Sequence, residues 1–164
     1  MYAETIPFLV HNLKATSAFL KKAEAHCDAR KIDKAVMLGL RLAPDMFDLK
    51  RQVMLITDFA KGAGARLSGT AIPSYTDDET TFEQLQARLT KTIDFLSGLP
   101  KAAFDGAEAR EVTMRARGQD IKLNGRDYFS GAALPNFYFH MATAYDILRH
   151  SGVELGKGDF LMRG

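Results

Sequence analysis

Apolar residues recur every three or four positions in four long stretches of the chain, which is the spacing of helices that bury one face. These stretches run over residues 5–27, 44–69, 82–96 and 135–152. Pro44 and Pro135 suit a first helical turn, where a missing N–H group leaves no hydrogen bond unmade. Gly69 and Gly152 suit left-handed caps at helix C-termini. The pattern therefore predicts four long amphipathic helices.

The segments outside these helices differ in character. Residues 70–79 are polar and contain a proline, and the segment is long enough to cross the end of a helix bundle. Thr80 and Glu83 have the spacing of a capping box at the start of the third helix. Residues 153–162 lack helical spacing, so we expect no helix there.

Between the third and fourth helices the period of the pattern changes to two. Residues 111–117 and 120–124 alternate polar and apolar side chains around Gly118 and Gln119, which suit a two-residue hairpin turn. The pattern thus predicts an all-α fold, a four-helix bundle with a small β-hairpin inserted between helices 3 and 4. A length of 164 residues fits one domain, so we expect residues 1–164 to form a single unit.

Composition narrows the classes of function and location. Hydrophobic residues make up 46% of the chain and charged residues 26%, as in ordinary soluble domains. The formal net charge is +2 and no basic run is present, so we expect no nucleic-acid binding. No apolar stretch approaches the ~20 residues that span a membrane. Glu4 stands where a signal peptide carries positive charge, so we expect a cytoplasmic protein.

Three side chains of the first and fourth helices bear on reactivity and on partner binding. The single cysteine, Cys27, excludes an internal disulfide, and its place on an apolar stripe favours a buried, unreactive thiol over a reactive one. Phe19 departs from the stripe of the first helix, so we expect it to be exposed. Together with Phe139 in the fourth helix, it would then offer a surface for a partner protein.

The fourth helix carries the most informative histidine of the chain. Phe137, Met141, Ala144 and Leu148 fall on one stripe of this helix, and His140 lies at its edge. His140 therefore points into a groove rather than into bulk water. It is either a partly buried histidine bonded to a neighbouring helix or a residue that contacts a ligand or acts in catalysis.

The second helix offers the polar residues best placed to meet His140. Asp45 and Gln52 are seven residues apart, or two helical turns, on the margin of its inner face. Asp45 is explained equally well as a capping residue beside the positive end of the helix dipole. Both interpretations stay open.

Sequence signatures of common enzymes are absent. The chain has no Walker-type phosphate loop, no dinucleotide-binding glycine pattern and no nucleophile elbow. It also lacks the Glu-x-x-His pairs of carboxylate-bridged diiron bundles. No inner helix face other than that of the fourth helix supplies a histidine, so a three-histidine metal site is not expected.

Three segments resemble a bacterial family of unknown function. They are residues 135–149 followed by Gly152, residues 42–47 with Gln52, and residues 155–161. That family is placed in the DinB/YfiT-like superfamily, which includes metalloenzymes. The resemblance covers essentially the whole chain and implies a DinB-like four-helix bundle that forms a homodimer.

The resemblance also bears on metal binding. Metal-binding members of the superfamily carry one histidine on the second helix and a His-x-x-x-His pair on the fourth. Here His140 matches the first of that pair, but Ala144 replaces the second, and the second helix has no histidine. A three-histidine site therefore does not carry over. Any divalent metal would need an oxygen-rich site made by Asp45, Gln52 and His140.

These observations leave three functional hypotheses. The first is a groove for a small-molecule ligand lined by Asp45, Gln52, His140 and Tyr145, in which His140 would be the general acid or base if catalysis occurs. The second is a non-enzymatic, dimeric interaction protein that uses exposed aromatic residues. The third is a metal-dependent transferase or hydrolase with a ligand set other than three histidines. Whether the protein is an enzyme stays open.

Overall fold

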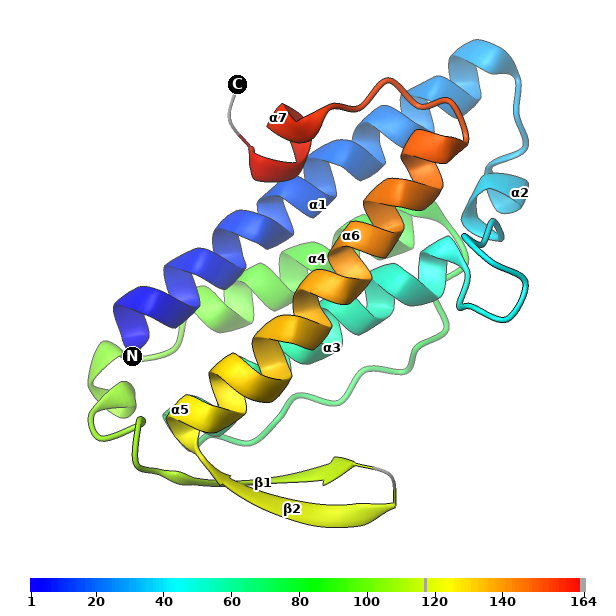
Figure 1. Cartoon of the computed structure of the whole chain (residues 1–164). Helices are drawn as coiled ribbons and strands as arrows, with labels where there is room; N and C mark the ends of the chain where they lie inside the picture. Colours follow the sequence, from blue (N-terminus) through cyan, green and yellow to red (C-terminus); the bar gives the residue numbers. More distant parts are fainter. Residues whose placement is uncertain (117, 163–164) are drawn as a thin grey trace.

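Four long helices pack side by side in the structure, a computed structural model that describes residues 1–116 and 118–162 (Figure 1). These helices are α1 (Tyr2–Arg30), α3 (Leu49–Ser68), α4 (Phe82–Ser97) and α6 (Leu134–His150). Helix α3 contacts both α4 and α6, and α1 contacts α4. The predicted four-helix bundle is confirmed. None of the helices in the described part of the chain is long and apolar enough to cross a membrane.

Shorter elements connect the long helices or follow them. They are α2 (Lys34–Leu38), the 3-10 turn η1 (Lys101–Phe104), α5 (Gly125–Tyr128), the π-helical turn η2 (Phe129–Ala133) and α7 (Lys157–Leu161). Elements α5, η2 and α6 follow one another without a break, so the chain enters α6 as one continuous helical path. Pro135 lies in the first turn of α6, as predicted.

The predicted hairpin consists of β1 (Glu111–Ala116) and β2 (Gln119–Asn124), which pair in antiparallel fashion. Ala116 pairs with Gln119, so Gln119 belongs to the second strand and not, as predicted, to the turn. Gly118 has a φ of +79°, a conformation that glycine adopts readily. Arg117, which the sequence analysis assigned to the first strand, lies outside the described residues.

The start of α3 differs from the prediction. The helix begins at Leu49 rather than near Pro44, because the Asp48 side chain accepts a hydrogen bond from the backbone N–H of Arg51 at 3.0 Å and caps the helix there. The preceding residues form an irregular loop, closed by a backbone bond from Leu49 N to Leu40 O of 2.9 Å.

Two other boundaries also shift. The capping box of α4 is made by Thr81 and Gln84 instead of Thr80 and Glu83, although the helix spans the predicted residues. The tail contains a short helix, α7, which the sequence pattern did not predict. In α7, Asp159 accepts a hydrogen bond from the backbone N–H of Gly156 at 2.8 Å, and such a short helix buries too few side chains to show a period.

The prediction that Phe19 is exposed is wrong. Its side chain is fully buried, and its ring lies edge-on to Tyr145 of α6 at 6.4 Å between centroids. Helix α1 is covered by α4 along one side and by α6 and α7 along another, so its buried face is wider than one stripe (Figure 1). Cys27 is buried, as predicted.

Alanine substitutions at two glycines, Gly125 and Gly131, would test the packing of the residues that lead into α6. A methyl group added at Gly125 would lie 1.9 Å from the carbonyl oxygen of Ala107, which is backbone and cannot rotate away. We expect Gly125→Ala to lower the free energy of unfolding by roughly 1–3 kcal/mol, measured by urea denaturation. A methyl group at Gly131 meets nothing within 4 Å, so Gly131→Ala should be neutral or slightly stabilising. Equal effects of the two substitutions would contradict the close approach at Gly125.

Candidate functional site

His140 of α6 and Gln52 of α3 meet inside the bundle, where the two helices pack together. His140 Nδ1 lies 2.7 Å from Gln52 Oε1, and the bond spans 88 positions in the sequence. His140 is 8% exposed and Gln52 only 1%, so this bond is screened from water. The pair confirms that His140 is bonded to a neighbouring helix.

The orientation of the Gln52 amide decides which nitrogen of His140 carries the proton. The amide nitrogen of Gln52 donates a hydrogen bond to the carbonyl oxygen of Phe47 at 3.1 Å. A carbonyl can only accept, so the Gln52 amide nitrogen faces Phe47 and its oxygen faces His140. That oxygen must therefore accept a hydrogen bond from Nδ1–H. The neutral ring therefore presents an unprotonated Nε2 with a free lone pair.

Nε2 is the nitrogen of this histidine that is free to accept a hydrogen bond. Within the described part of the chain it makes no hydrogen bond, and no fully buried side-chain nitrogen or oxygen there lacks a partner. Nε2 therefore accounts for some of the small exposed area of His140. It is a hydrogen-bond acceptor at the edge of the α3–α6 contact.

Aromatic side chains surround the imidazole. The Phe59 ring stacks on it at 5.4 Å and 16°, and the Phe139 ring meets it edge-on at 5.2 Å. Phe139 and Phe47 are each 55% exposed, although both are large apolar side chains. The exposure of Phe139 was predicted from the sequence. The surroundings of His140 are thus apolar beneath the ring and at its rim.

Burial lowers the pKa of His140 from 6.5 to about 4, with a smaller contribution from the positive charge of Arg51. The ring is therefore uncharged at neutral pH. General acid–base catalysis works best when the pKa of the group lies near the working pH. His140 is thus better suited to accepting a hydrogen bond than to transferring a proton.

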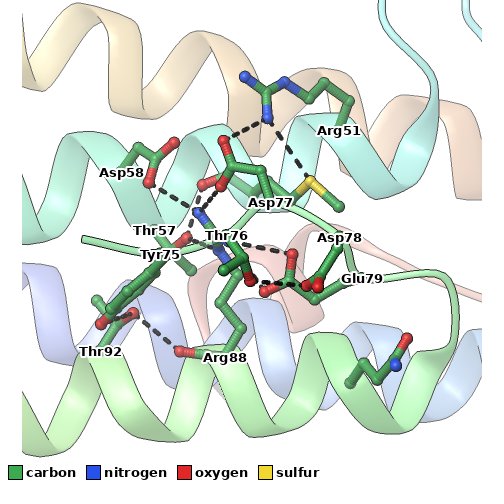
Figure 2. Close-up of polar contacts among 12 residues, drawn as sticks. Arg51, Thr57, Asp58, Tyr75, Thr76, Asp77, Asp78, Glu79, Arg88 and Thr92 are labelled. Carbon is green, nitrogen blue, oxygen red and sulfur yellow. Dashed lines mark hydrogen bonds and ion pairs between the residues drawn. The ribbon is translucent and has the colours of Figure 1, made fainter. Parts of the chain in front are cut away.

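A second polar cluster surrounds Arg88 of α4, on the side of α3 that faces α4 (Figure 2). Arg88 is almost completely buried, at 3% exposure. It donates to Thr57 Oγ1 at 2.7 Å and to Glu79 Oε1 at 2.9 Å. It also lies 2.8 Å from Asp58 Oδ1 and 2.7 Å from Asp77 Oδ1. One arginine thus joins α3 and α4 to the chain segment between them.

That segment, residues 71–80, is here called the strap. It has no helix or strand, and it runs along α3 and α4 (Figure 1). Asp77 Oδ2 also accepts a hydrogen bond from Arg51 of α3 at 2.8 Å. Burial alone would raise the pKa of the Asp77 carboxyl, but the hydrogen bonds from Arg51 and Arg88 outweigh it and lower the pKa below its usual value.

Between the strap and the start of α3 lies an open cleft of about 390 Å³. Its wall includes Arg51, Phe47 and Asp77. Phe47 also holds the Gln52 amide through its carbonyl oxygen. The cleft and the Gln52–His140 pair are therefore neighbours at the beginning of α3.

The chain matches the model of a known protein family. The model of a domain of unknown function, DUF1993, matches residues 1–161. The chain belongs to the DUF1993 family. No curated protein matches it.

A solved structure supports the superfamily. The DUF1993 chain is similar to the crystal structure of a DinB family member protein from Shewanella denitrificans, with 40% sequence identity and a TM-score of 0.91. The match covers 98% of this chain and 90% of that one. The DinB-like fold expected from the resemblance is therefore confirmed.

The residues around His140 do not fit the metal site that the superfamily implies. In this DUF1993 chain, Gln52 uses both ends of its amide for hydrogen bonds, and Ala144 stands where a second histidine of α6 would be needed. Within residues 1–116 and 118–162 no three His, Cys, Asp or Glu side chains are grouped as metal ligands. His140 Nε2 alone is one ligand, whereas a tight site for zinc needs at least three from the protein.

Two of the four residues predicted for the groove lie elsewhere. Asp45 is exposed in the loop before α3, because that helix begins four residues after it. Tyr145 lies about 140° around α6 from His140, and its ring contacts Phe19 and Phe160. The structure thus brings together Gln52 and His140 but neither Asp45 nor Tyr145.

Phe59, Arg51 and Arg88 were not among the residues predicted for the site. Phe59 follows Gln52 by seven residues, so helical spacing alone places both on one face of α3. Arg88 lies three residues after Leu85, on the buried face of α4. An arginine on an apolar stripe is the signal that could have revealed its cluster.

Proposed function

We propose that this DUF1993 protein binds a small molecule at the edge of the α3–α6 contact, with His140 Nε2 accepting a hydrogen bond from the ligand. The observation that carries the proposal is the hydrogen bond from His140 Nδ1 to Gln52 Oε1. It leaves a lone pair on Nε2 at every pH above the lowered pKa of His140. The cell compartment that we propose is the cytoplasm, as expected from the sequence.

The surroundings define the class of ligand. An uncharged imidazole accepts a hydrogen bond from a neutral O–H or N–H group. Phe47 and Phe139, both half exposed, supply an apolar rim for the body of the ligand. A small neutral molecule with an aromatic or aliphatic body and one donor group matches both features. The proposal concerns binding, since a pKa of about 4 makes His140 a weak base.

Phenol is a suitable first probe, because it combines an aromatic ring with one O–H donor. In protein labelled with ¹⁵N at histidine, we expect His140 to show the Nδ1–H tautomer at pH 7, and we expect phenol to shift its Nε2 resonance. His140→Phe removes the acceptor while keeping a ring, and it should weaken phenol binding at least tenfold. His150→Phe is the matched control, because His150 is exposed at the end of α6.

Two outcomes would overturn the proposal. One is equal affinity of phenol and related alcohols for wild type and His140→Phe. The other is an Nε2–H tautomer in the free protein, since Nε2 would then be a donor.

A second candidate function, interaction with another copy of the chain, is favoured by the exposure of Phe47 and Phe139 on neighbouring parts of one surface. If these rings form the contact of a homodimer, sedimentation equilibrium should give a dimer for wild type. Phe139→Ser should then raise the dissociation constant at least tenfold. Val36→Ser, at a side chain of similar exposure on α2, is the control. A monomeric wild type at 100 μM would remove this candidate.

A further inference from the structure

The cleft between α3 and the strap has three cationic side chains on one wall. They are Lys50 and Arg51 in the first turn of α3, and Arg41 in the loop that precedes this helix. Asp48 forms an ion pair with Lys50 at 3.1 Å and lies 3.9 Å from Arg41. Arg51 forms its ion pair with a residue of the strap, Asp77, at 2.8 Å.

Asp77 adopts a backbone conformation that is unusual for a residue with a side chain. Its φ is +58°, in the left-handed region, which Asp and Asn tolerate better than other non-glycine residues. The strap therefore accepts a local conformational cost to place this carboxylate between Arg51 and Arg88.

The strap is attached almost entirely by side chains. No backbone–backbone hydrogen bond joins residues 71–80 to the rest of the described chain. Asp77 and Glu79 bond to arginines, and the Tyr75 ring lies under Arg88 with 4.8 Å between the guanidinium carbon and the ring centroid. A displacement of Asp77 would therefore break ion pairs but no backbone ladder.

We propose that this cleft binds the carboxylate or phosphate group of a small molecule at Arg51, and that Asp77 occupies the same position on Arg51 when no such ligand is bound. Arg51 presents a forked donor of the kind that binds both anions in bidentate fashion. The site goes beyond the function proposed for His140, since it shares no hydrogen-bonding group with the Gln52–His140 pair.

Arg88 keeps other partners if Asp77 moves away. Without it, Arg88 still has Asp58, Glu79 and Thr57 as partners within hydrogen-bonding distance. Arg51, in contrast, would lose the ion pair that it makes across the cleft. An incoming anion replaces the pair on Arg51 with an equivalent one, so the net cost of the exchange is the contact between Asp77 and Arg88.

The same arrangement predicts weak binding in the wild-type protein. Asp48, Asp78 and Glu79 also line the cleft and repel an anion. Asp77 competes directly, at the high effective concentration of an attached group. We therefore expect millimolar affinity for simple anions and a large gain when the competing charge is removed.

The test uses inorganic phosphate and succinate as probes, titrated at constant ionic strength and followed by NMR and calorimetry. Asp77→Asn keeps the shape of the side chain and tolerates a positive φ, so the strap should keep its path. We expect this substitution to tighten binding of at least one probe tenfold or more. Adding Arg51→Gln in the same chain should abolish the gain. Comparison of the two probes shows whether a phosphate or a carboxylate is preferred.

Asp78→Asn is the matched control, because Asp78 lies on the same strap and lines the same cleft but bonds to the Thr76 hydroxyl rather than to an arginine. It removes one negative charge from the cleft without freeing Arg51. A gain equal to that of Asp77→Asn would mean that net charge alone attracts the anion, which would overturn the proposal.

The wild-type protein provides a measurement that does not depend on the stability of any variant. Phosphate or succinate should shift the Arg51 Nε–H resonance and the amide resonances of the strap more than sodium chloride of equal ionic strength does. If neither probe has this effect, or if Asp77→Asn binds both probes no tighter than wild type, the proposal fails. Loss of phenol binding at His140 would leave this result untouched, so the two proposals are tested separately.

Discussion

Replacing Arg88 with methionine should lower the free energy of unfolding by about 3–5 kcal/mol, the range found when one partner of a buried ion pair is removed. Methionine fills much of the same volume but leaves Glu79, whose side chain is 13% exposed, without its cation. Asp58 and Asp77 keep Lys61 and Arg51 as partners. Urea denaturation followed by circular dichroism measures the change.

A second substitution separates charge from packing in this prediction. If the uncompensated Glu79 carboxylate causes the loss, adding Glu79→Gln to Arg88→Met should restore part of the stability. Lys122→Met is the matched control, because Lys122 pairs with Glu111 on the hairpin and both side chains are more than 60% exposed. It should leave stability unchanged. A similarly small effect of Arg88→Met would show that the cluster is dispensable.

The second large effect is a dependence of stability on pH that originates at His140. In the unfolded chain this histidine takes up a proton near pH 6.5, but in the folded protein it does so only near pH 4. Between these values the unfolded state binds more protons, so stability falls as the pH falls. The shift corresponds to roughly 3 kcal/mol lost between pH 7 and pH 4.

The measurement is the difference in unfolding free energy between wild type and His140→Gln across this range. Glutamine can still donate to Gln52 but does not titrate, so the variant should lack the contribution of His140 and lose less stability on acidification. His150→Gln, at an exposed site on the same helix, should follow wild type. Parallel curves for wild type and His140→Gln would show that His140 is not held neutral by burial.

Helical periodicity was sufficient to predict the bundle and the meeting of His140 with Gln52. Both residues lie at the margins of apolar stripes, and two such margins face each other when α3 and α6 pack. The same reasoning misplaced Asp45, because the capping bond of Asp48, rather than the proline at position 44, sets the start of α3. The prediction that Phe19 is exposed was wrong for a related reason, since a single apolar stripe does not describe a helix that is covered on two sides.

The contacts of the strap could not have been predicted in this way. Residues 71–80 have no period, so no face can be assigned to Asp77 or Glu79. Their partners depend on the path of the chain across α3 and α4, which tertiary packing decides. Only the arginine at an inward position of α4 hinted that charged side chains meet beneath the strap.

The way in which the strap is attached also bears on how its length can vary among relatives. No backbone–backbone hydrogen bond fixes residues 71–74 against the bundle. An insertion or deletion before Tyr75 therefore changes only the length of a loosely attached connection. Between Asp77 and the helix cap at Thr81 the spacing is constrained, because both arginine-bound carboxylates must reach Arg88 from a fixed start of α4. We therefore expect homologous chains to differ in length before Tyr75 and to agree in length after it.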